Sequence, residues 1–553
     1  MIKQNHLSKI LVFCFTMLTF AGYSQSTFSN VRALFSANCT NGCHTATSPT
    51  GNLDLTGTDT EVYQRLVNAT PTNPAAAARN WKRIKPGYPD RSFLLRKCNN
   101  NLYPNAGLDG QDLGAPMPTY PQPAMQPQEI ELIRQWVYKG APQTGNVVNI
   151  NTVNTYYTEG GINSVPNPPP VPTEPGAFQL HLGKIFLEPQ TEVEYFIKYD
   201  LELTDFIRVN RLDLQMAPQS HHFILYKLIP NAVSLFPEGL RLQNPNSGAG
   251  SSSGYNTMVN AWQISYDTYL PQGTAYKWDG GSVLDMNFHL RNYSTDSILA
   301  SEVYINVYTV PNNTDDVIMY SDLVTNLNIA IPNNNQPVTF TAANFLPSET
   351  HYWNLWQLTS HTHKYGRDYD IFTRTASGQQ GEQIYEGFYD IDYTFNQGYY
   401  NFSHPPIRQF EPMYQLNPRL GLIQQATFQN NGPNTVYFGL TTDDEMMVYY
   451  YQYTLGDLID NPTSISEIDE LKLSVFPNPN AGEFSLQFTA NTTGTASIRL
   501  TDLAGRAVVT EQKSVTQGNN TYTFNYSKQL SSGIYLMEII AGQERSIKRI
   551  SIK

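Results

Sequence analysis

The sequence predicts a multidomain, mainly β protein with a small helical domain before the strands and a small β-sandwich at the end. Three observations support this prediction. Helical periodicity is confined to residues 26–142, the stretch from 178 to about 454 alternates apolar and polar residues as strands do, and proline-rich or polar segments separate the blocks. The chain of 553 residues has room for three or four domains of roughly 150 residues each.

The first segment, residues 1–25, has the three-part layout of a secretory signal peptide. "MIKQNHLSK" precedes the apolar run "ILVFCFTMLTF", and "AGYSQS" contains the expected cleavage position near Ser24 or Gln25. The apolar run is too short to span a bilayer, and no other stretch is apolar enough to be transmembrane. We therefore expect an exported chain that loses Cys14 with the signal peptide.

The helical block covers residues 26–143. Phe28, Val31 and Phe35 share one helical face, and a second amphipathic run, "QEIELIRQWVYKG", ends at Gly140. Residues 144–176, which include "SVPNPPPVPTEPG", are expected to form a linker that lets this domain move relative to the strands. The net charge of −12 and the lack of a Lys or Arg run argue against nucleic acid or an anionic membrane as a partner.

The helical block contains the motif "CTNGCH", residues 39–44. The haem attachment signature is Cys-x-x-Cys-His, and the segment here has one extra residue between the cysteines. It resembles the minority Cys-x-x-x-Cys-His sites and, with "GAPMP", the cytochrome c domains of exported bacterial proteins. The resemblance implies haem c bound to Cys39 and Cys43, with His44 as proximal ligand and Met117 as distal ligand.

Two alternatives to this arrangement are open. Met125 is the rival of Met117 as distal ligand, and Cys39 and Cys43 can instead form a disulfide beside an unrelated histidine. Cys98 has no partner once the other two thiols carry haem, so it is expected to be a buried thiol.

The all-strand region offers metal ligands in four separated stretches. "SHHF" contains His221 and His222, "NFHLR" contains His289, "SHTHKYG" contains His361 and His363, and "DDEMMVYYY" contains Met446. Side chains at i and i+2 of a strand share a face, so the two histidines of "HTH" can converge on one point. His221 and His222 are adjacent and point to opposite faces of a regular strand, so both can ligate only if the backbone bends there or they use different ring nitrogens.

This set resembles the copper type II, ascorbate-dependent monooxygenases, which include peptidylglycine hydroxylating and dopamine β-monooxygenase. The resemblance implies two tandem antiparallel, jelly-roll-like β-sandwiches over residues 177–325 and 326–457. It also implies two copper ions, one held by His221, His222 and His289 and the other, catalytic, by His361, His363 and Met446. Imidazole suits copper and the thioether favours Cu(I).

The chain departs from that family at positions that choose the substrate. Thr359 stands where peptide-amidating members carry an arginine, and Val448 stands where they carry an asparagine, although Tyr450 keeps the aromatic hydroxyl. Peptide amidation is therefore not expected. His181, His351 and His404 match nothing in the motif and are interpreted as structural.

The last block, residues 473–553, follows a linker at 458–472. "SVFPNPNAGEFSLQF", "LTDLAGRAV" with Gly505 and "LSSGIYLMEI" with Gly533 and Tyr535 resemble the type A sorting domain of the type IX secretion system of Bacteroidota. A generic adhesion module is the alternative. The resemblance implies export through the periplasm and outer membrane to the cell surface or the medium, with the secretion machinery as a partner.

Together these features predict a secreted copper monooxygenase that hydroxylates a C–H bond of an organic small molecule with O2. Electrons come from an external donor, and the fused haem domain can relay them. The alternative is a secreted haem and copper protein that transfers electrons or binds metal without hydroxylase activity. A third hypothesis is an adhesin whose metal sites are vestigial.

Overall fold

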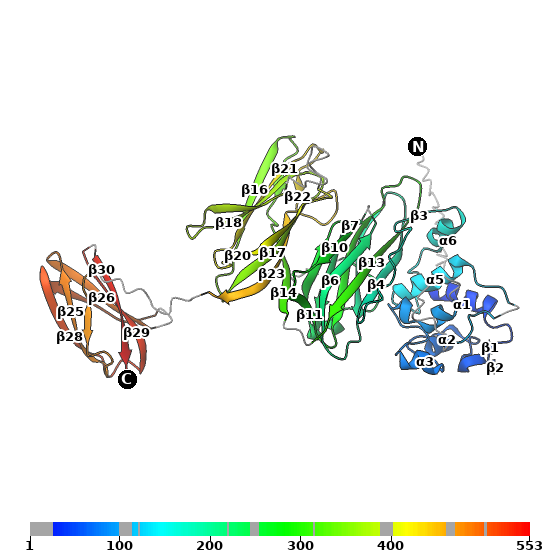
Figure 1. The fold of residues 1–553 in the computed structure, drawn as a ribbon, viewed down its shortest axis with the longest axis horizontal. Coiled ribbons are helices and arrows are strands. Elements are labelled where there is room, and N and C mark those ends of the chain that lie inside the picture. The colour runs from blue at the N-terminus through cyan, green and yellow to red at the C-terminus, as the bar shows by residue number, and fades with distance from the viewer. Residues whose placement is uncertain are drawn as a thin grey trace, which may run out of the picture. The chain divides into compact units, whose positions relative to one another are not determined.

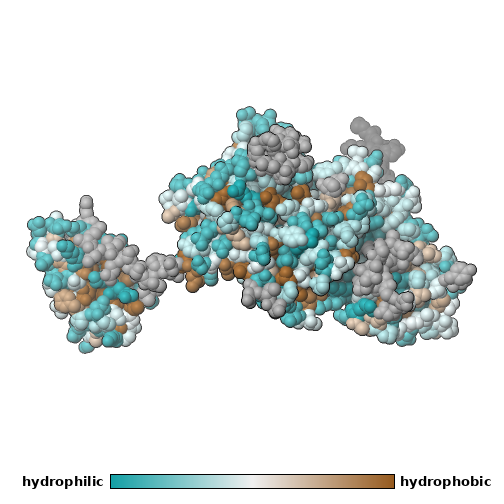
Figure 2. All heavy atoms as spheres, in the orientation of Figure 1, coloured by the Kyte–Doolittle hydropathy of each residue, from teal (hydrophilic) through white to brown (hydrophobic). Residues whose placement is uncertain are grey.

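The computed structural model describes most of the chain, in two compact units. The described residues are 26–98, 113–119, 122–217, 220–243, 254–312, 316–387, 402–459, 471–502, 506–542 and 544–553. The predicted signal peptide and Gly505 lie outside them. Unit 1 covers residues 1–457 and unit 2 covers 458–553, which agrees with the start of the expected linker at 458. In the described residues no helix is long and apolar enough to cross a membrane. Figure 2 shows hydrophilic (teal) and intermediate (white) residues over much of the visible face, with hydrophobic (brown) patches between them.

Unit 1 begins with a helical domain (Figure 1). Its elements are α1 (Thr27–Asn38), the short strands β1 (His44–Thr45) and β2 (Ser48–Pro49), α2 (Asp59–Leu66), α3 (Pro74–Ala78), α4 (Phe93–Cys98), α5 (Pro127–Tyr138) and α6 (Ile150–Thr158). Side-chain caps fix where these helices begin. The Ser26 hydroxyl accepts a hydrogen bond from the Ser29 amide, and Thr58 and Glu61 form a capping box at α2. The helices enclose an apolar core in which Phe28 stacks on Trp136.

The segment 144–176 is more structured than a linker. It contains α6, capped by Asn149, and β3 (Ile162–Asn163), which pairs in parallel with a strand of the main sheet. Val153 of α6 is buried in the helical core. The prolines that predicted a flexible linker begin only after this ordered part, at Pro166.

The helical domain is also docked on the strands that follow. The buried Arg134 of α5 donates hydrogen bonds to the Gly183 carbonyl (2.6 Å) and the Lys184 carbonyl (2.8 Å). At a second place Lys85 and Arg91 form ion pairs with Glu202 (2.7 and 3.3 Å). Polar contacts on both sides of the expected linker therefore join the helical domain to the strands in this structure.

Strands make up the rest of unit 1. They are β4 (Phe178–Leu187), β5 (Glu192–Asp200), β6 (Ile207–Met216), β7 (Ser220–Leu228), β8 (Arg241–Leu242), β9 (Asn256–Trp262), β10 (Tyr266–Tyr269), β11 (Thr274–Trp278), β12 (Val283–Arg291), β13 (Leu299–Val310), β14 (Val317–Thr325), β15 (Ala330–Ile331), β16 (Pro337–Asn344), β17 (His351–His361), β18 (Gly366–Arg374), β19 (Gln380–Glu386), β20 (Ile407–Leu416), β21 (Leu422–Gln429), β22 (Val436–Tyr437) and β23 (Val448–Leu458).

Two sandwiches share one long sheet. The main sheet has the order β20-β17-β23-β14-β11-β6-β13-β3, with β4 and β10 paired at its side. The sheet β8-β5-β12-β7-β9 covers one part of it around an apolar core that includes Phe223 and Phe288, and β16-β21-β18-β19 covers the other around Tyr369 and Phe428. The antiparallel pair β14–β23 crosses the expected boundary at residue 325. The two halves are therefore held together by backbone hydrogen bonds.

Unit 2 is a small β-sandwich of two antiparallel sheets. Its strands are β24 (Ser474–Phe476), β25 (Glu483–Ala490), β26 (Gly494–Asp502), β27 (Ala507–Val515), β28 (Gly518–Asn525), β29 (Gly533–Ala541) and β30 (Glu544–Ile552). The sheets β24-β25-β28 and β27-β26-β29-β30 enclose alternate side chains such as Phe488 and Met537. The predicted small sandwich is confirmed.

Candidate metal centre and thiol-lined cavity

Two adjacent histidines of β7 point into one cluster because the strand is irregular there. His289 of β12 pairs with His222, whereas the next residue, Leu290, pairs with Ser220, so the register skips His221. Such a bulge places one extra residue opposite the partner strand and re-aims its side chain. The backbone bend that the pair "HH" requires is thus present in the structure.

The five histidines of the candidate motifs gather in a single cluster. The ring centroid of His221 lies 4.7 Å from that of His289, 5.2 Å from His361 and 4.8 Å from His363. His222 lies 5.2 Å from His289 and 5.7 Å from His361. His361 ends β17, and His363 follows two residues later with its ring centroid 5.2 Å away. All are buried except His221, which is half-buried.

Polar partners orient three of these rings. His289 donates from Nε2 to the Glu192 carboxylate (2.6 Å), and His222 donates from Nε2 to the Asn287 side-chain oxygen (3.1 Å). His363 donates from Nδ1 to the backbone carbonyl of Asp444 (3.2 Å). In each ring the second nitrogen keeps its lone pair, as metal-ligating histidines require.

These second nitrogens have no hydrogen-bond partner. The unpartnered atoms are both ring nitrogens of His221 and His361, Nδ1 of His222 and His289, and Nε2 of His363. Leaving so many buried polar atoms unsatisfied is costly unless something binds them. Burial, with the neighbouring histidines, lowers the pKa of His363 to about 3 and places the pKa values of His221 and His361 well below 6.5. Neutral imidazoles with free lone pairs are suitable ligands for a transition metal.

The cluster divides differently from the two predicted copper sets. Ligand atoms of His221, His222 and His361 all lie within 4.8 Å of one another, and this group takes members from both sets. The separation into two independent triads is therefore not seen. The shared sheet accounts for this, because it brings the end of β17 against the bulge in β7. Met446 lies beside the cluster, on the wall of a cleft that His222 and His289 also line.

Glu445 ties the "HTH" segment to the methionine segment. Its carboxylate accepts hydrogen bonds from the amides of His363, Tyr365 (3.0 Å) and Met446 (2.9 Å). Met447, the next residue, is instead buried in the core, where its sulfur accepts a hydrogen bond from Asn326 (3.3 Å). The half-buried Met446 is thus the methionine that faces the cleft.

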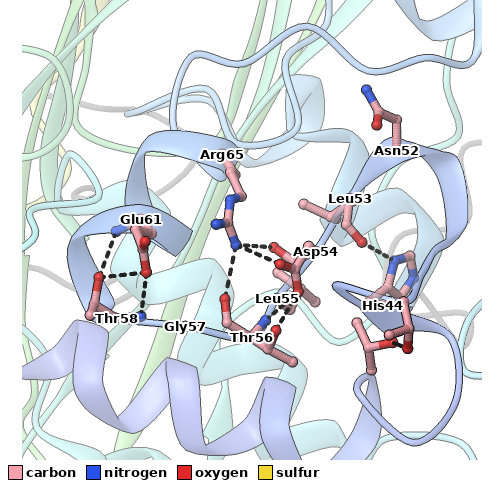
Figure 3. A network of polar contacts seen from close by, with 12 residues as sticks. His44, Asn52, Leu53, Asp54, Leu55, Thr56, Gly57, Thr58, Glu61 and Arg65 are labelled. Carbon is pink, nitrogen blue, oxygen red and sulfur yellow. Dashed lines mark hydrogen bonds and ion pairs between the residues drawn. The ribbon is translucent and has the colours of Figure 1, made fainter.

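The helical domain contains the second candidate site, an apolar cavity of about 420 Å³. Cys39, Cys43, His44, Cys98 and Met117 line it, and all three cysteines are free thiols. His44 is buried and donates from Nδ1 to the Leu53 carbonyl (3.1 Å), as Figure 3 shows. The Nε2 lone pair of His44 is therefore available to a ligand, as the predicted role of this residue as an iron ligand requires.

The lining of the cavity distinguishes the two methionines that are candidates for the distal ligand. Met117 lines it, whereas Met125 is buried in the apolar core of the helical domain. Cys98 is buried, and burial raises the pKa of its thiol above the usual range. Burial and the neighbouring Cys43 raise the pKa of Cys39 to about 11, so this thiol is protonated at neutral pH.

The remaining predicted residues are placed as follows. His181 stacks on Tyr304 and hydrogen-bonds to Glu302 (3.0 Å), and His351 hydrogen-bonds to Thr350 (2.9 Å), so both have ordinary structural partners. His404 is half-buried and belongs to no group of potential metal ligands among the described residues. Tyr450 is buried, lines the cleft and lies 6.5 Å from His361 between ring centroids.

Sequence reasoning missed the residues that orient the rings. Glu192 accepts hydrogen bonds from His289 and from the Thr442 hydroxyl (2.7 Å), which outweigh its burial and lower its pKa to about 2. Glu194 lies 3.4 Å from His222 Nε2. The alternation Glu-x-Glu at the start of a strand with apolar neighbours was the available signal, because i and i+2 share a face. No local pattern pointed to Asn287.

The comparisons with known proteins identify only the end of the chain. Residues 474–553 match the family model described as "Secretion system C-terminal sorting domain". No curated protein matches the chain. Among solved structures, it is similar to PorZ, a surface component of the type-IX secretion system of Porphyromonas gingivalis, at 19% identity over 20% of this chain and 14% of that chain, with a TM-score of 0.12.

A second group of solved structures is equally distant. A β-glucuronidase of Faecalibacterium prausnitzii matches at 9% identity over 39% of this chain and 36% of the enzyme, with a TM-score of 0.12. A β-glucuronidase of Ruminococcus gnavus in complex with D-glucuronic acid matches at 10% identity over 40% of this chain and 37% of the enzyme, also with a TM-score of 0.12. Likeness at this level says nothing about the metal centre or the cavity. The sorting domain shows that the chain is exported, to the cell surface or the medium.

Proposed function

We propose that this secreted protein is a copper-dependent monooxygenase. It would hydroxylate a C–H bond of an organic substrate with O2, and one oxygen atom would enter the product while the other leaves as water. Two electrons and two protons from an external donor balance the reaction. The observation that carries the proposal is the cluster of five histidines, each of which has at least one ring nitrogen without a hydrogen-bond partner.

The residues present fit copper. Bound copper would supply the reduction of O2, and neutral imidazole nitrogens are ligands that copper accepts readily. Glu192, Asn287 and the Asp444 carbonyl hold the protons of His289, His222 and His363 on the outward-facing nitrogens. Glu445 holds the segment of His363 against that of Met446, so the thioether stays at the cleft wall beside the cluster.

We also propose that the cavity of the helical domain holds covalent haem c. The apolar lining, the two free thiols of Cys39 and Cys43 and the oriented ring of His44 suit that group. The described cysteines and His44 form no compact group of metal ligands, which disfavours a small tetrahedral metal site there. Met117 is the favoured distal ligand because it, and not Met125, lines the cavity.

The docked helical domain supports a role as an electron relay. Strand β5 contacts the helical domain at one end, where the Tyr199 hydroxyl donates to Asp90 (2.7 Å), and the cluster at the other end, where Glu192 accepts from His289. A single strand thus contacts both the helical domain and the histidine cluster.

Copper and oxygen measurements test the main proposal. Elemental analysis of the secreted protein should find copper, and oxygen uptake with a reductant should depend on an added organic substrate. The His361→Ala variant should lose both the bound copper and the substrate-dependent oxygen uptake. The His351→Ala variant, changed at the other end of the same strand, should keep both properties. Copper without substrate-dependent uptake would favour the electron-transfer alternative, and a protein that binds no copper would leave the sites vestigial.

A further inference from the structure

A large cleft lies beside the histidine cluster. It has a volume of about 1100 Å³, and its walls come from β5, β7 and β12 on one side and from β14, β22 and β23 on the other. Large apolar side chains make up much of its wall, including Phe196, Ile224, Leu323, Ile329, Phe438 and Val448. Its size is that of a site for a drug-sized molecule.

The carboxylates in this cleft are already engaged by the protein. Glu192 accepts from His289 and Thr442 and forms an ion pair with Arg291 (2.9 Å). Glu194 accepts from the Asn287 amide (2.8 Å), and Asp444 accepts from the Thr441 hydroxyl (2.7 Å). A cationic ligand would have to compete with these partners for each carboxylate.

The cleft offers no positive charge to an anionic ligand. Among the described residues that line it, none is lysine or arginine. The nearby Arg241 is committed to Asp285, with which it makes two hydrogen bonds (2.6 and 2.5 Å). An anion buried without a partner pays a large desolvation cost, so the wall discriminates against carboxylate and phosphate groups.

The rim of the cleft is apolar as well. Leu242, Leu327 and Tyr437 line the cleft and leave more than half of their side-chain surface exposed. Exposed large apolar side chains that border a hollow are typical of ligand-binding grooves.

We propose that the cleft binds a neutral, predominantly apolar organic molecule as the substrate of the metal centre. The proposal deepens the proposed function and rests on it for the word substrate. The C–H bond to be hydroxylated would lie at the end of the cleft formed by His222, His289 and Met446. Gln243 and Thr325 add neutral polar side chains to the lining of the cleft, which suits a ligand with one hydroxyl or carbonyl group.

Binding of three ten-carbon probes, whose polar groups are neutral, anionic and cationic, tests this proposal. Isothermal titration calorimetry of the purified full chain, before and after treatment with a chelator, should be run with 1-decanol, decanoate and decylammonium. We expect 1-decanol to bind at least about tenfold more tightly than either charged probe, equivalent to about 1.4 kcal/mol. Because binding and not turnover is measured, the result does not depend on copper or on oxygen chemistry.

A matched pair of variants locates the binding. Leu327 and Leu235 are exposed to the same degree, 62% and 61%, but only Leu327 lines the cleft. Leu327→Arg should strengthen decanoate binding about tenfold, through a new ion pair at the rim, and Leu235→Arg should leave it unchanged. Circular dichroism confirms that both variants fold.

Each outcome decides. Equal affinity for a charged probe, no binding of 1-decanol, or the same effect of both arginine variants would overturn the proposal. If the protein is purified without copper and still binds 1-decanol tightly, the proposed preference of the cleft for neutral ligands stands and the proposed monooxygenase is rejected. Copper-dependent oxygen uptake with charged substrates alone would do the reverse.

Discussion

The thiol-lined cavity and the histidine cluster are both candidate cofactor sites, yet the chain builds them in opposite ways. The cavity takes its key residues from one short stretch, residues 39–44, and surrounds them with apolar side chains. The cluster takes its histidines from β7, from β12, and from the end of β17 and the residues just after it, and they are separated by up to 142 positions in sequence (221 to 363). A local motif specifies the first site, whereas the packing of two sandwiches specifies the second.

The largest expected effect tests whether the cluster is one unit. His221 lies within 5.7 Å, between ring centroids, of each of the other four histidines. His221→Ala should therefore remove most of the bound copper and leave the haem content unchanged, as measured by elemental analysis and haem absorbance. Loss of half of the copper would instead restore two independent sites.

The second test acts on the proposed haem site. Cys43→Ala removes one of the two thiols proposed to hold haem, so covalent haem staining on denaturing gels should fall to a small fraction of the wild-type signal, with copper unchanged. Cys98→Ala is the control, because this buried thiol lies outside the motif. Equal staining of the wild type and Cys43→Ala would reject covalent attachment through this residue.

The third test acts on the contact between the two regions. Arg134 is fully buried, forms an ion pair with Glu131 and donates to two carbonyls of β4. Arg134→Ala leaves the Glu131 carboxylate buried without its cation, and it should lower the free energy of unfolding by about 3–5 kcal/mol. Denaturant unfolding, with hydrogen exchange of α5, measures the effect.

Lys277→Ala is the control for this test. The ion pair of Lys277 with Asp279 lies at the surface, where both side chains are about half exposed, so its loss should change the free energy of unfolding by less than about 1 kcal/mol. Equal effects of both variants would show that the Arg134 contact does not hold the helical domain in place.

The contrast between the sites also explains what the sequence could predict. Strand alternation and helix periodicity predicted the mainly β architecture and the small C-terminal sandwich, since both patterns are local. The spacing "HTH" predicted that His361 and His363 converge on one point, and their ring centroids lie 5.2 Å apart although His363 follows the end of β17. The union of all five histidines depends on β14–β23 pairing and on the bulge at His221, and neither leaves a local pattern in the sequence.

The linker prediction shows the same limit. Prolines after residue 165 are visible in the sequence, but the buried contacts of Arg134 with Gly183 and Lys184 join segments about 50 residues apart. A single cation in an amphipathic helix looks like a surface residue. Its partners become visible only when β4 is placed against α5.

The smallest expected effect compares the two methionines of the helical domain. Met117→Leu keeps the volume but removes the thioether sulfur from the cavity wall, so covalent haem should be retained while its absorption spectrum changes and its reduction potential falls, since an axial thioether raises the potential. Met125→Leu swaps one apolar side chain for another of similar volume in the core, which typically costs less than about 1.5 kcal/mol and should leave the spectrum unchanged. Visible spectroscopy with a redox titration of both variants makes the comparison. The opposite pattern, with a changed spectrum only in Met125→Leu, would assign the distal ligand to Met125 and contradict the proposal that the haem lies in the cavity lined by Met117.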